Sequence, residues 1–321
     1  MILLTGAAGF IGSCLLQHLN SLGRTDLILV DDFSNPSKQK NLIGKVYHRI
    51  IHRDQLFDWL KIYGKDISFI YHLGARTDTT EKNRQIFNDL NLSYSKKVWQ
   101  FCVQNNCPLV YASSAATYGL GEWGFEDSHS IVDKLKPLNP YGDSKNEFDL
   151  WALNQKDKPG FWAGLKFFNV YGPNEYHKGR MASVVFHTFH QIQRTGKMKL
   201  FRSHRPDIEH GQQSRDFIFI QDIVRISAFF LEHPNKSGLY NLGTGSARSF
   251  WDLAVTTFEA LGLEPQISFI DTPLDIRDTY QYFTEAKMTK LRKAGYQKPC
   301  LSLEEGINLY VKQYLLPQKY Y

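Results

Sequence analysis

A glycine-rich turn between a short strand and a helix constrains the fold of this chain more than any other feature. The apolar run Ile2–Thr5 enters Gly6-Ala7-Ala8-Gly9-Phe10-Ile11-Gly12, after which Leu15, Leu16 and Leu19 recur at helical spacing. Glycines in such a turn allow a tight reversal and a close backbone approach to a pyrophosphate, and the N-terminus of the following helix attracts the anion. A GxxGxxG pattern alone is weak, but its position between a strand and a helix predicts a dinucleotide site.

The second apolar run bears on which dinucleotide is bound. Leu27–Val30 ends in Asp31 and Asp32, and an acid about 20 residues after the glycine turn accepts hydrogen bonds from the adenosine ribose, which favours NAD. Lys38 and Arg53 argue the other way, because both could neutralise a ribose 2′-phosphate and so favour NADP. The two cations could equally be ordinary solvated loop residues, so the residues themselves leave the choice open.

Strands and helices alternate up to about residue 173. Further apolar runs at 46–51, 67–73, 109–112 and 163–168 are separated by helical patterns, the longest at roughly 85–106. This order predicts an α/β fold, a Rossmann-like doubly wound parallel sheet. Beyond residue 173 the alternation loosens. We therefore expect a dinucleotide-binding domain of residues 1–173 with returning segments at about 216–245, and a smaller substrate-binding domain of about 174–215 and 246–321. In this second half we expect helices at about 181–195, 221–233, 250–261, 284–294 and 302–315, and a strand at 239–242.

A tyrosine and a lysine four residues apart form a candidate proton-transfer unit. Tyr141 and Lys145 follow Asn139-Pro140, where proline suits the first turn of a helix, and a spacing of four places both side chains on one face. A free phenol has a pKa of about 10, so a neighbouring ammonium is needed to favour phenolate at neutral pH. An ordinary surface pair is the alternative reading. Ser114 ends the 109–112 strand region, and ligands of parallel sheets bind beyond the C-terminal strand ends.

Composition narrows the class of partner. The formal net charge of +6 is modest and spread along the chain, which suits an anionic small molecule better than a nucleic-acid groove. No apolar run reaches the roughly 18 residues of a membrane span, and the start has no leader pattern, so we expect no membrane partner and a cytoplasmic location. His187, His204 and His210 match no metal-ligand spacing, so we expect no metal site.

Taken together, these motifs resemble the extended short-chain dehydrogenase/reductase superfamily. The resemblance rests on GAAGFIG at 6–12, SSAATYG at 113–119, YGDSK at 141–145 and FFNVYGP at 167–173, in the order and separation of that superfamily. It implies that Ser114, Tyr141 and Lys145 are the catalytic set. Ser114 would hold the substrate oxygen, Tyr141 would exchange its proton, and Lys145 would bind the nicotinamide ribose while lowering the pKa of Tyr141.

A narrower resemblance is to the ADP-glycero-manno-heptose 6-epimerases within that superfamily. It is carried by YASSAATYG, FNVYGPNEYHKGRMASVVFH, SRDFIFIQDI and YQYFTEAKMTKLRKAGY. It implies epimerisation at C6 of the heptose through a 6-keto intermediate with tightly bound NADP, in lipopolysaccharide core precursor synthesis, by a homo-oligomer. It also implies Lys178 as a second acid/base residue. Besides Tyr141 and Lys145, the further cofactor-binding residues that we expect are Leu73, Gly74, Ala75, Asn91, Val170 and Lys178. The expected substrate-binding residues, besides Ser114, are Asn169, Arg180, His187, Phe201, Arg215 and Tyr280.

Two departures from the epimerase pattern keep other functions open. The segment between Phe201 and Arg215 is longer than expected, and Arg180 stands where a small polar residue is typical. The nearest alternative is an epimerase or dehydratase acting on another nucleotide-diphospho-sugar. A non-catalytic NADP-binding sensor is a further alternative, which the intact catalytic set disfavours. Lys178 could instead be a phosphate contact or a solvated loop lysine.

Overall fold

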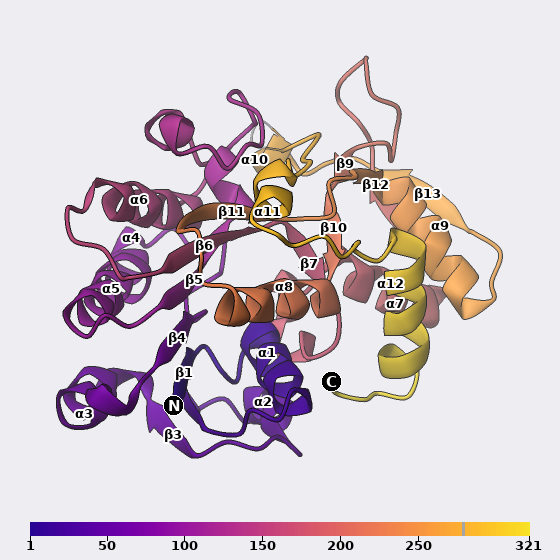
Figure 1. The fold of residues 1–321 in the computed structure, drawn as a ribbon. Helices are drawn as coiled ribbons and strands as arrows, with labels where there is room; N and C mark the ends of the chain where they lie inside the picture. The colour runs from indigo at the N-terminus through magenta and orange to yellow at the C-terminus, as the bar shows by residue number, and fades with distance from the viewer. Residues whose placement is uncertain (278–279) are drawn as a thin grey trace.

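The centre of the protein is a seven-stranded parallel sheet with helices on both faces (Figure 1). A computed structural model describes residues 1–277 and 280–321. The strand order is β11-β6-β5-β4-β1-β2-β3, so the direction of winding reverses between β1 and β4. Ligands of such sheets bind outside the C-terminal strand ends at this reversal. The predicted doubly wound, Rossmann-like fold is confirmed.

The elements have the following bounds. The strands are β1 Ile2–Thr5, β2 Leu27–Asp31, β3 Arg49–His52, β4 Phe69–His72, β5 Leu109–Ser114, β6 Trp162–Phe167, β7 Asn169–Tyr171, β8 Met198–Phe201, β9 Ser214–Arg215, β10 Phe217–Phe219, β11 Gly238–Leu242, β12 Arg248–Ser249 and β13 Ile267–Ile270. The helices are α1 Phe10–Ser21, α2 Pro36–Gln39, α3 Leu56–Tyr63, α4 Arg84–Phe87, α5 Tyr94–Gln104, α6 Pro140–Asn154, α7 Val184–Thr195, α8 Ile220–Glu232, α9 Phe250–Leu261, α10 Leu274–Arg277, α11 Thr289–Lys293 and α12 Leu303–Tyr310. A π-helical segment, η4 Asn88–Ser93, joins α4 to α5, and a short helical segment, η7 Tyr176–Met181, precedes α7.

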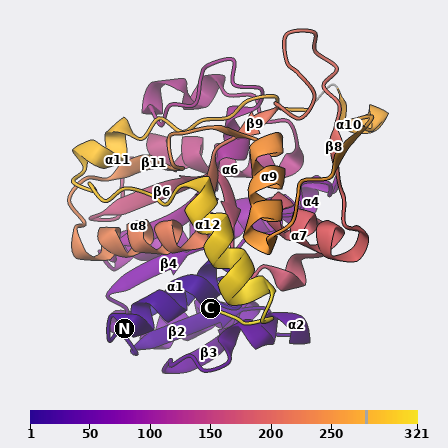
Figure 2. The same cartoon turned by 90° about the vertical axis from the view of Figure 1, so that its right-hand side faces the viewer.

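The two faces of the sheet are buried in two separate cores. Leu3 and Ile28 point into the core under α3, α5 and α6, whereas Leu4 and Leu29 point into the core under α1, α8 and α12. The views at right angles show these helix layers on opposite sides of the sheet (Figure 2). Successive strand residues point to opposite faces, so a strand covered on both sides needs a continuous apolar run. This explains the continuous apolar runs Ile2–Leu4 in β1, Leu27–Val30 in β2 and Phe69–Tyr71 in β4.

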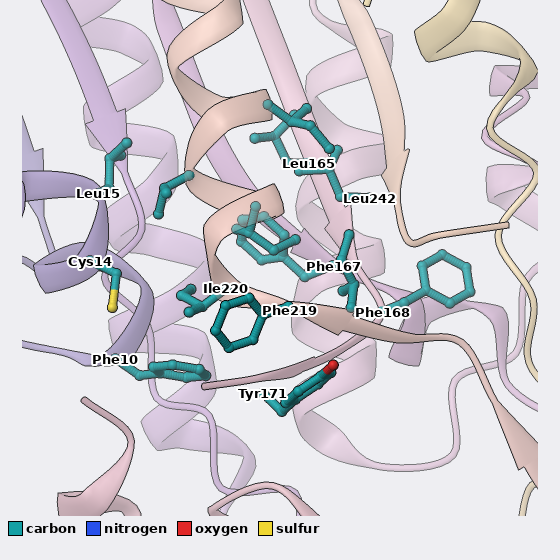
Figure 3. Close-up of a cluster of buried hydrophobic side chains, with 14 of the residues drawn as sticks. Phe10, Cys14, Leu15, Leu165, Phe167, Phe168, Tyr171, Phe219, Ile220 and Leu242 are labelled. Carbon is teal, nitrogen blue, oxygen red and sulfur yellow. The ribbon is translucent and has the colours of Figure 1, made fainter. Parts of the chain in front are cut away.

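The second half of the chain returns to the sheet. β11 pairs with β6 in parallel, and β10 pairs with β7. Phe167 of β6, Phe219 of β10 and Ile220 of α8 pack with Phe10 and Cys14 of α1 in one cluster (Figure 3). A smaller core lies between α7, β8 and α9, and the segment between β8 and β9 projects from the molecule (Figure 1). The division near residue 173 into two domains stays a prediction.

Two elements differ from the expected ones for local reasons. β3 begins at Arg49 instead of residue 46, because the amide of Val46 donates to Oδ1 of Asn20 (2.8 Å). The helix expected at 284–294 is reduced to α11, because the amide of Ala286 donates to Oδ2 of Asp216 (3.0 Å) and that of Thr284 to the carbonyl of Ser214 (3.3 Å). Amides used in such long-range bonds are lost to a helix. The other four helices expected after residue 173 are confirmed.

Candidate active site

The glycine turn brings bare backbone to the start of α1. Gly6 has φ +67°, a left-handed conformation that favours glycine, and a Cβ on it would lie 2.7 Å from the amide nitrogen of Gly74. A Cβ on Gly12 would lie 2.1 Å from the carbonyl oxygen of Gly6. The residue before the helix, Gly9, has no side chain with which to cap the first amides. The start of α1 is therefore shaped for an anion that approaches the backbone.

A cleft of about 650 Å³ opens at this turn, where the strand order reverses. Most of the predicted cofactor-binding residues line it: Gly6, Gly9, Phe10, Ile11, Gly12, Asp31, Asp32, Lys38, Arg53, Leu73, Gly74, Ala75 and Lys178. These residues come from the ends of β1, β2, β3 and β4 and from segments that are far apart in the sequence. The structure therefore brings the predicted dinucleotide-binding residues together in one place.

Acids and cations are paired at the β2 end of the cleft. Asp31 accepts from the amide of Ala8 (2.9 Å) and from the ammonium of Lys38 (2.5 Å). Asp32 lies 3.3 Å from the guanidinium of Arg53, and hydrogen bonds from Ser34 lower the pKa of its carboxyl to about 2. Both the residues that favour NAD and those that favour NADP therefore line the same end of the cleft.

Helix α6 carries the tyrosine and lysine as expected. The Asn139 side chain accepts from the amide of Gly142 (2.9 Å) and caps the helix, and Pro140 occupies its first turn. Lys145 is buried and donates to the carbonyl of Ala112 in β5 (2.8 Å). Helix α6 is thereby attached to the strand that ends in Ser114.

Ser114, Tyr141 and Lys145 lie together at the end of β5. Burial raises the pKa of Tyr141, and a hydrogen bond to Ser114 opposes that rise. Burial also lowers the pKa of Lys145, to about 8. The expected lowering of the pKa of Tyr141 by Lys145 is not seen, because loss of hydration is the larger effect and the ammonium of Lys145 is directed to a backbone carbonyl.

Lys178 lies in the wall of the same cleft, in η7. Its ammonium is 5.6 Å from the ring centroid of Phe10, the first residue of α1. Burial lowers the pKa of Lys178, whereas the nearby carboxyl of Glu175 raises it. Glu175 is itself 1% exposed and accepts from the hydroxyls of Ser183 (2.7 Å) and Tyr310 (3.0 Å). A rigid polar anchor therefore holds the segment that carries Lys178.

Four predicted cofactor residues are absent from the lining of the cleft within the described part of the chain: Asn91, Tyr141, Lys145 and Val170. Asn91 is buried in η4, where its amide accepts from the backbone N–H of Arg76 (2.8 Å) and donates to the carbonyl of Arg76 (3.0 Å) and to Oγ of Ser144 (3.0 Å). This side chain connects the loop after β4 to α6. Asn91 therefore fixes the position of this loop relative to α6.

Five of the predicted substrate-binding residues fall into two groups. Phe201 and Tyr280 have ring centroids 6.2 Å apart, and the guanidinium of buried Arg215 lies 5.5 Å from the ring of Tyr280. Arg180 and His187 are exposed, and Nε2 of His187 lies 3.4 Å from the carbonyl of Arg180. Asn169 is exposed at the start of β7, apart from both groups in the sequence.

Some residues of the cleft were not predicted. Arg76, Asp78, Tyr94, His177 and Met181 also line it. The first two follow β4, so the strand-end rule that selected Ser114 could have found them. His177 lies next to Lys178, and burial lowers its pKa to about 4. Tyr94 stands within a helical pattern, where nothing in the sequence distinguishes it from a core residue.

Metal-binding clusters and membrane-spanning helices are both absent from residues 1–277 and 280–321. No group of three or more histidine, cysteine, aspartate or glutamate side chains in these residues has an arrangement that could hold a metal ion. Within the same residues, no helix combines the length and the apolar character needed to span a bilayer.

The fold and the site define a known enzyme family. Residues 2–243 match the family described as "NAD dependent epimerase/dehydratase family", and the chain belongs to it. The resemblance to the extended short-chain dehydrogenases/reductases is thereby confirmed. The cleft fits the nicotinamide dinucleotide of that family, since the turn leaves no room for a Cβ at Gly6 or Gly12 and the start of α1 is uncapped by Gly9.

Individual relatives narrow the class. The chain is 46% identical to ADP-L-glycero-D-manno-heptose-6-epimerase of Fusobacterium nucleatum, with 100% of both chains covered. It is similar in structure to the Helicobacter pylori enzyme of the same name (TM-score 0.81, 27% identity, 97% and 95% covered). It is also similar to MoeE5 in complex with UDP-glucuronic acid and NAD (TM-score 0.76, 26% identity, 97% and 99% covered). The chain is therefore an epimerase, an enzyme of the isomerase class.

Proposed function

We propose that this enzyme inverts C6 of the heptose in ADP-glycero-manno-heptose, as a step in making a lipopolysaccharide core precursor. The full-length similarity to enzymes that bear this name supports the substrate. The observation that carries the reaction type is the position of Lys178 in the wall of the glycine-turn cleft. An epimerase of this kind needs a second proton-transfer group besides Tyr141, because the hydroxyl at C6 points to opposite sides in the two epimers.

Each half-reaction moves one proton and one hydride. When bound, the dinucleotide supplies the acceptor and the later donor of the hydride from C6. Either Tyr141 or Lys178 removes the proton of the C6 hydroxyl as the ketone forms. Ser114 donates a hydrogen bond to the sugar oxygen. After the side chain has turned its other face, the same hydride returns to C6 and the second group supplies the proton to the oxygen.

Burial shifts both proton-transfer groups toward their neutral forms. It raises the pKa of Tyr141 and lowers the pKa of Lys178. We infer that each of the two groups serves one orientation of the C6 hydroxyl.

We propose NADP as the resident cofactor. Lys38 and Arg53 both line the β2 end of the cleft, where a ribose 2′-phosphate would lie, and a phosphate would compete with Asp31 and Asp32 for them. Mass spectrometry of the nucleotide released on denaturation tests this assignment. Recovery of NADP supports it, and recovery of NAD alone would overturn it.

The function is tested with the purified enzyme and both heptose epimers. We expect interconversion of the D,D and L,D forms of the ADP-heptose without added cofactor. Lys178→Met should retain cofactor and fold but lose turnover by orders of magnitude. Lys290→Met is the matched control, because burial also lowers the pKa of Lys290, whose ammonium donates to the carbonyl of Asp127 (3.0 Å). A cofactor-loaded sample that leaves both epimers unchanged would refute the proposal.

A second candidate is the same chemistry on another nucleotide-diphospho-sugar. Arg180 and the projecting segment between β8 and β9 are the two departures from the epimerase sequence pattern. Arg180 lies against the predicted substrate-binding residue His187, and the segment lies between two others, Phe201 and Arg215. Turnover of a uridine-linked sugar in preference to ADP-heptose would favour this candidate. From the resemblance we also propose a cytoplasmic homo-oligomer, which fractionation and size-exclusion chromatography with light scattering would test.

A further inference from the structure

A buried ion pair lies directly behind the catalytic residues. Asp149 on α6 is 0% exposed and stands one helical turn after Lys145 and two turns after Tyr141. Its Oδ2 accepts from the ammonium of Lys166 in β6 (2.7 Å), whose side chain is 1% exposed. Two charges that are removed from water are costly unless their polar atoms are satisfied, so the hydrogen-bond partners of this pair decide what it does.

The carboxylate of Asp149 joins α6 to β5. Its Oδ1 accepts from the hydroxyl of Tyr111 (2.9 Å), and its Oδ2 also accepts from the hydroxyl of Ser113 (2.6 Å). Tyr111 and Ser113 are alternate residues of the strand that ends in Ser114. The carboxylate therefore receives three donors from two strands, and it fixes the position of α6 along both of them.

The ammonium of Lys166 extends the network to Ser114. It donates to Oγ1 of Thr117 (2.8 Å), whose hydroxyl in turn donates to the backbone carbonyl of Ser114 (2.8 Å). The same ammonium lies 5.1 Å from the ring centroid of Tyr118. Loss of either charge would thus release the turn that follows β5 as well as the helix.

The network also sets the charge around Lys145. Asp149 raises the pKa of Lys145 and opposes the effect of burial. The other titratable groups that face this lysine are Tyr141 on α6 and His72 on β4, and the positive charge of Lys145 helps to lower the pKa of His72. On the exposed side of α6, Asp143 is paired with Arg84 of α4 (3.0 Å). Among these groups Asp149 is the anion that acts on Lys145.

We propose that Asp149, through its ion pair with Lys166, is a positioning residue that holds Ser114, Tyr141 and Lys145 in register and places a compensating negative charge beside Lys145. The inference rests on the proposed function only in that these three residues carry the reaction. The geometry that supports it is independent of which sugar is bound.

The test combines Asp149→Asn with a direct titration of Lys145. In protein with isotopically labelled lysine, the ammonium signal that disappears in Lys145→Arg is followed by NMR as the pH is raised. We expect Asp149→Asn to lower the titration midpoint by about one pH unit, because it removes the opposite charge that raises the pKa of Lys145. Turnover near neutral pH should fall about tenfold, and the basic limb of its pH profile should move in the same direction.

Two further variants separate positioning from general stability. Asp222→Asn removes a fully buried aspartate of α8 that pairs with Arg225 away from the cleft, and it should lower stability without moving the Lys145 titration. The double variant Asp149→Asn/Lys166→Met leaves no unpaired charge, so it should recover stability while the titration stays low. Asp149→Glu keeps the charge and should keep the titration close to that of the parent.

The outcomes are distinct. An unchanged Lys145 titration and pH profile in both Asp149→Asn and the double variant would overturn the inference, whatever happens to stability. A shifted titration in an enzyme that leaves ADP-heptose unchanged would support the inference while refuting the proposed function.

Discussion

Substitution of Gly12 by alanine tests the geometry of the cofactor turn. The added Cβ would lie 2.1 Å from the carbonyl oxygen of Gly6. A carbon and an oxygen normally stay about 3.3 Å apart, so the start of α1 or the turn must move by about 1 Å. Overpacking of this kind costs about 1–3 kcal/mol of folding stability. A shift of that size also breaks a charged hydrogen bond to the pyrophosphate, worth about 2 kcal/mol or about thirtyfold in affinity.

The matched control is Gly23→Ala at the other end of α1. Gly23 has φ +77°, and a Cβ added to it would meet no atom within 4 Å, so alanine there costs about 1–2 kcal/mol through backbone strain alone. Cofactor dissociation constants from calorimetry on stripped protein, with melting curves for both variants, separate the two effects. We expect similar losses of stability but weakened binding only in Gly12→Ala. Equal cofactor affinity in the two variants would refute the close-approach argument.

Three other residues in and around the site give separate tests. Burial lowers the pKa of His72 to about 3 from 6.5, so its contribution to stability is complete above about pH 6.5 and is lost as the pH falls, by about 1.4 kcal/mol per pH unit. In urea unfolding, the free energy of unfolding of His72→Gln should therefore fall less steeply with decreasing pH than that of the parent. An unchanged slope would contradict this reasoning. Arg180→Ser removes the ion pair to Asp78 (3.1 Å) at the cleft wall. Cofactor release, followed by stopped-flow, should quicken by up to about fivefold with little change in melting temperature. An unchanged release rate would show that this ion pair does not help to retain the cofactor. Asn174→Ala removes the bonds to the amide of Tyr321 (2.9 Å) and to Ser13 (2.9 Å), four residues before Lys178. Denaturant unfolding should show a loss of about 2 kcal/mol, and kinetics should show a larger fall in turnover than in cofactor affinity. Equal losses would show that the Lys178 segment does not depend on these bonds.

Local patterns predicted those parts of the fold that depend on near neighbours in the sequence. The strand, glycine turn and first helix follow from apolar periodicity and from the absence of a Cβ, and α6 follows from Asn139 and Pro140 at its start. The shortened α11 could not be predicted, because the amides of residues 284 and 286 are bonded to partners about 70 residues away. Helical propensity carries no information about such partners.

The site shows the same limit. Spacing alone placed Tyr141 and Lys145 on one face of a helix, and the structure agrees. The rise in the pKa of Tyr141 could not be predicted from this spacing, because it depends on the burial of the phenol and on where the ammonium of Lys145 points. The partners of Asn91 were also invisible in the sequence, since the loop after β4 and α6 meet it only in the folded chain.

The order of strands in the sheet has a consequence for biosynthesis. Among residues 1–277 and 280–321, those that line the cleft lie between Thr5 and Met181, whereas β11, the strand that covers the outer edge of β6, is completed only at Leu242. Ribosomes add about 5–20 residues per second, so a growing chain holds β6 as an uncovered edge for several seconds after the cofactor cleft has all its residues. An apolar edge of this kind invites pairing with another chain. Dinucleotide that binds the unfinished protein would stabilise it during that interval, and products that stop before residue 238 are expected to aggregate.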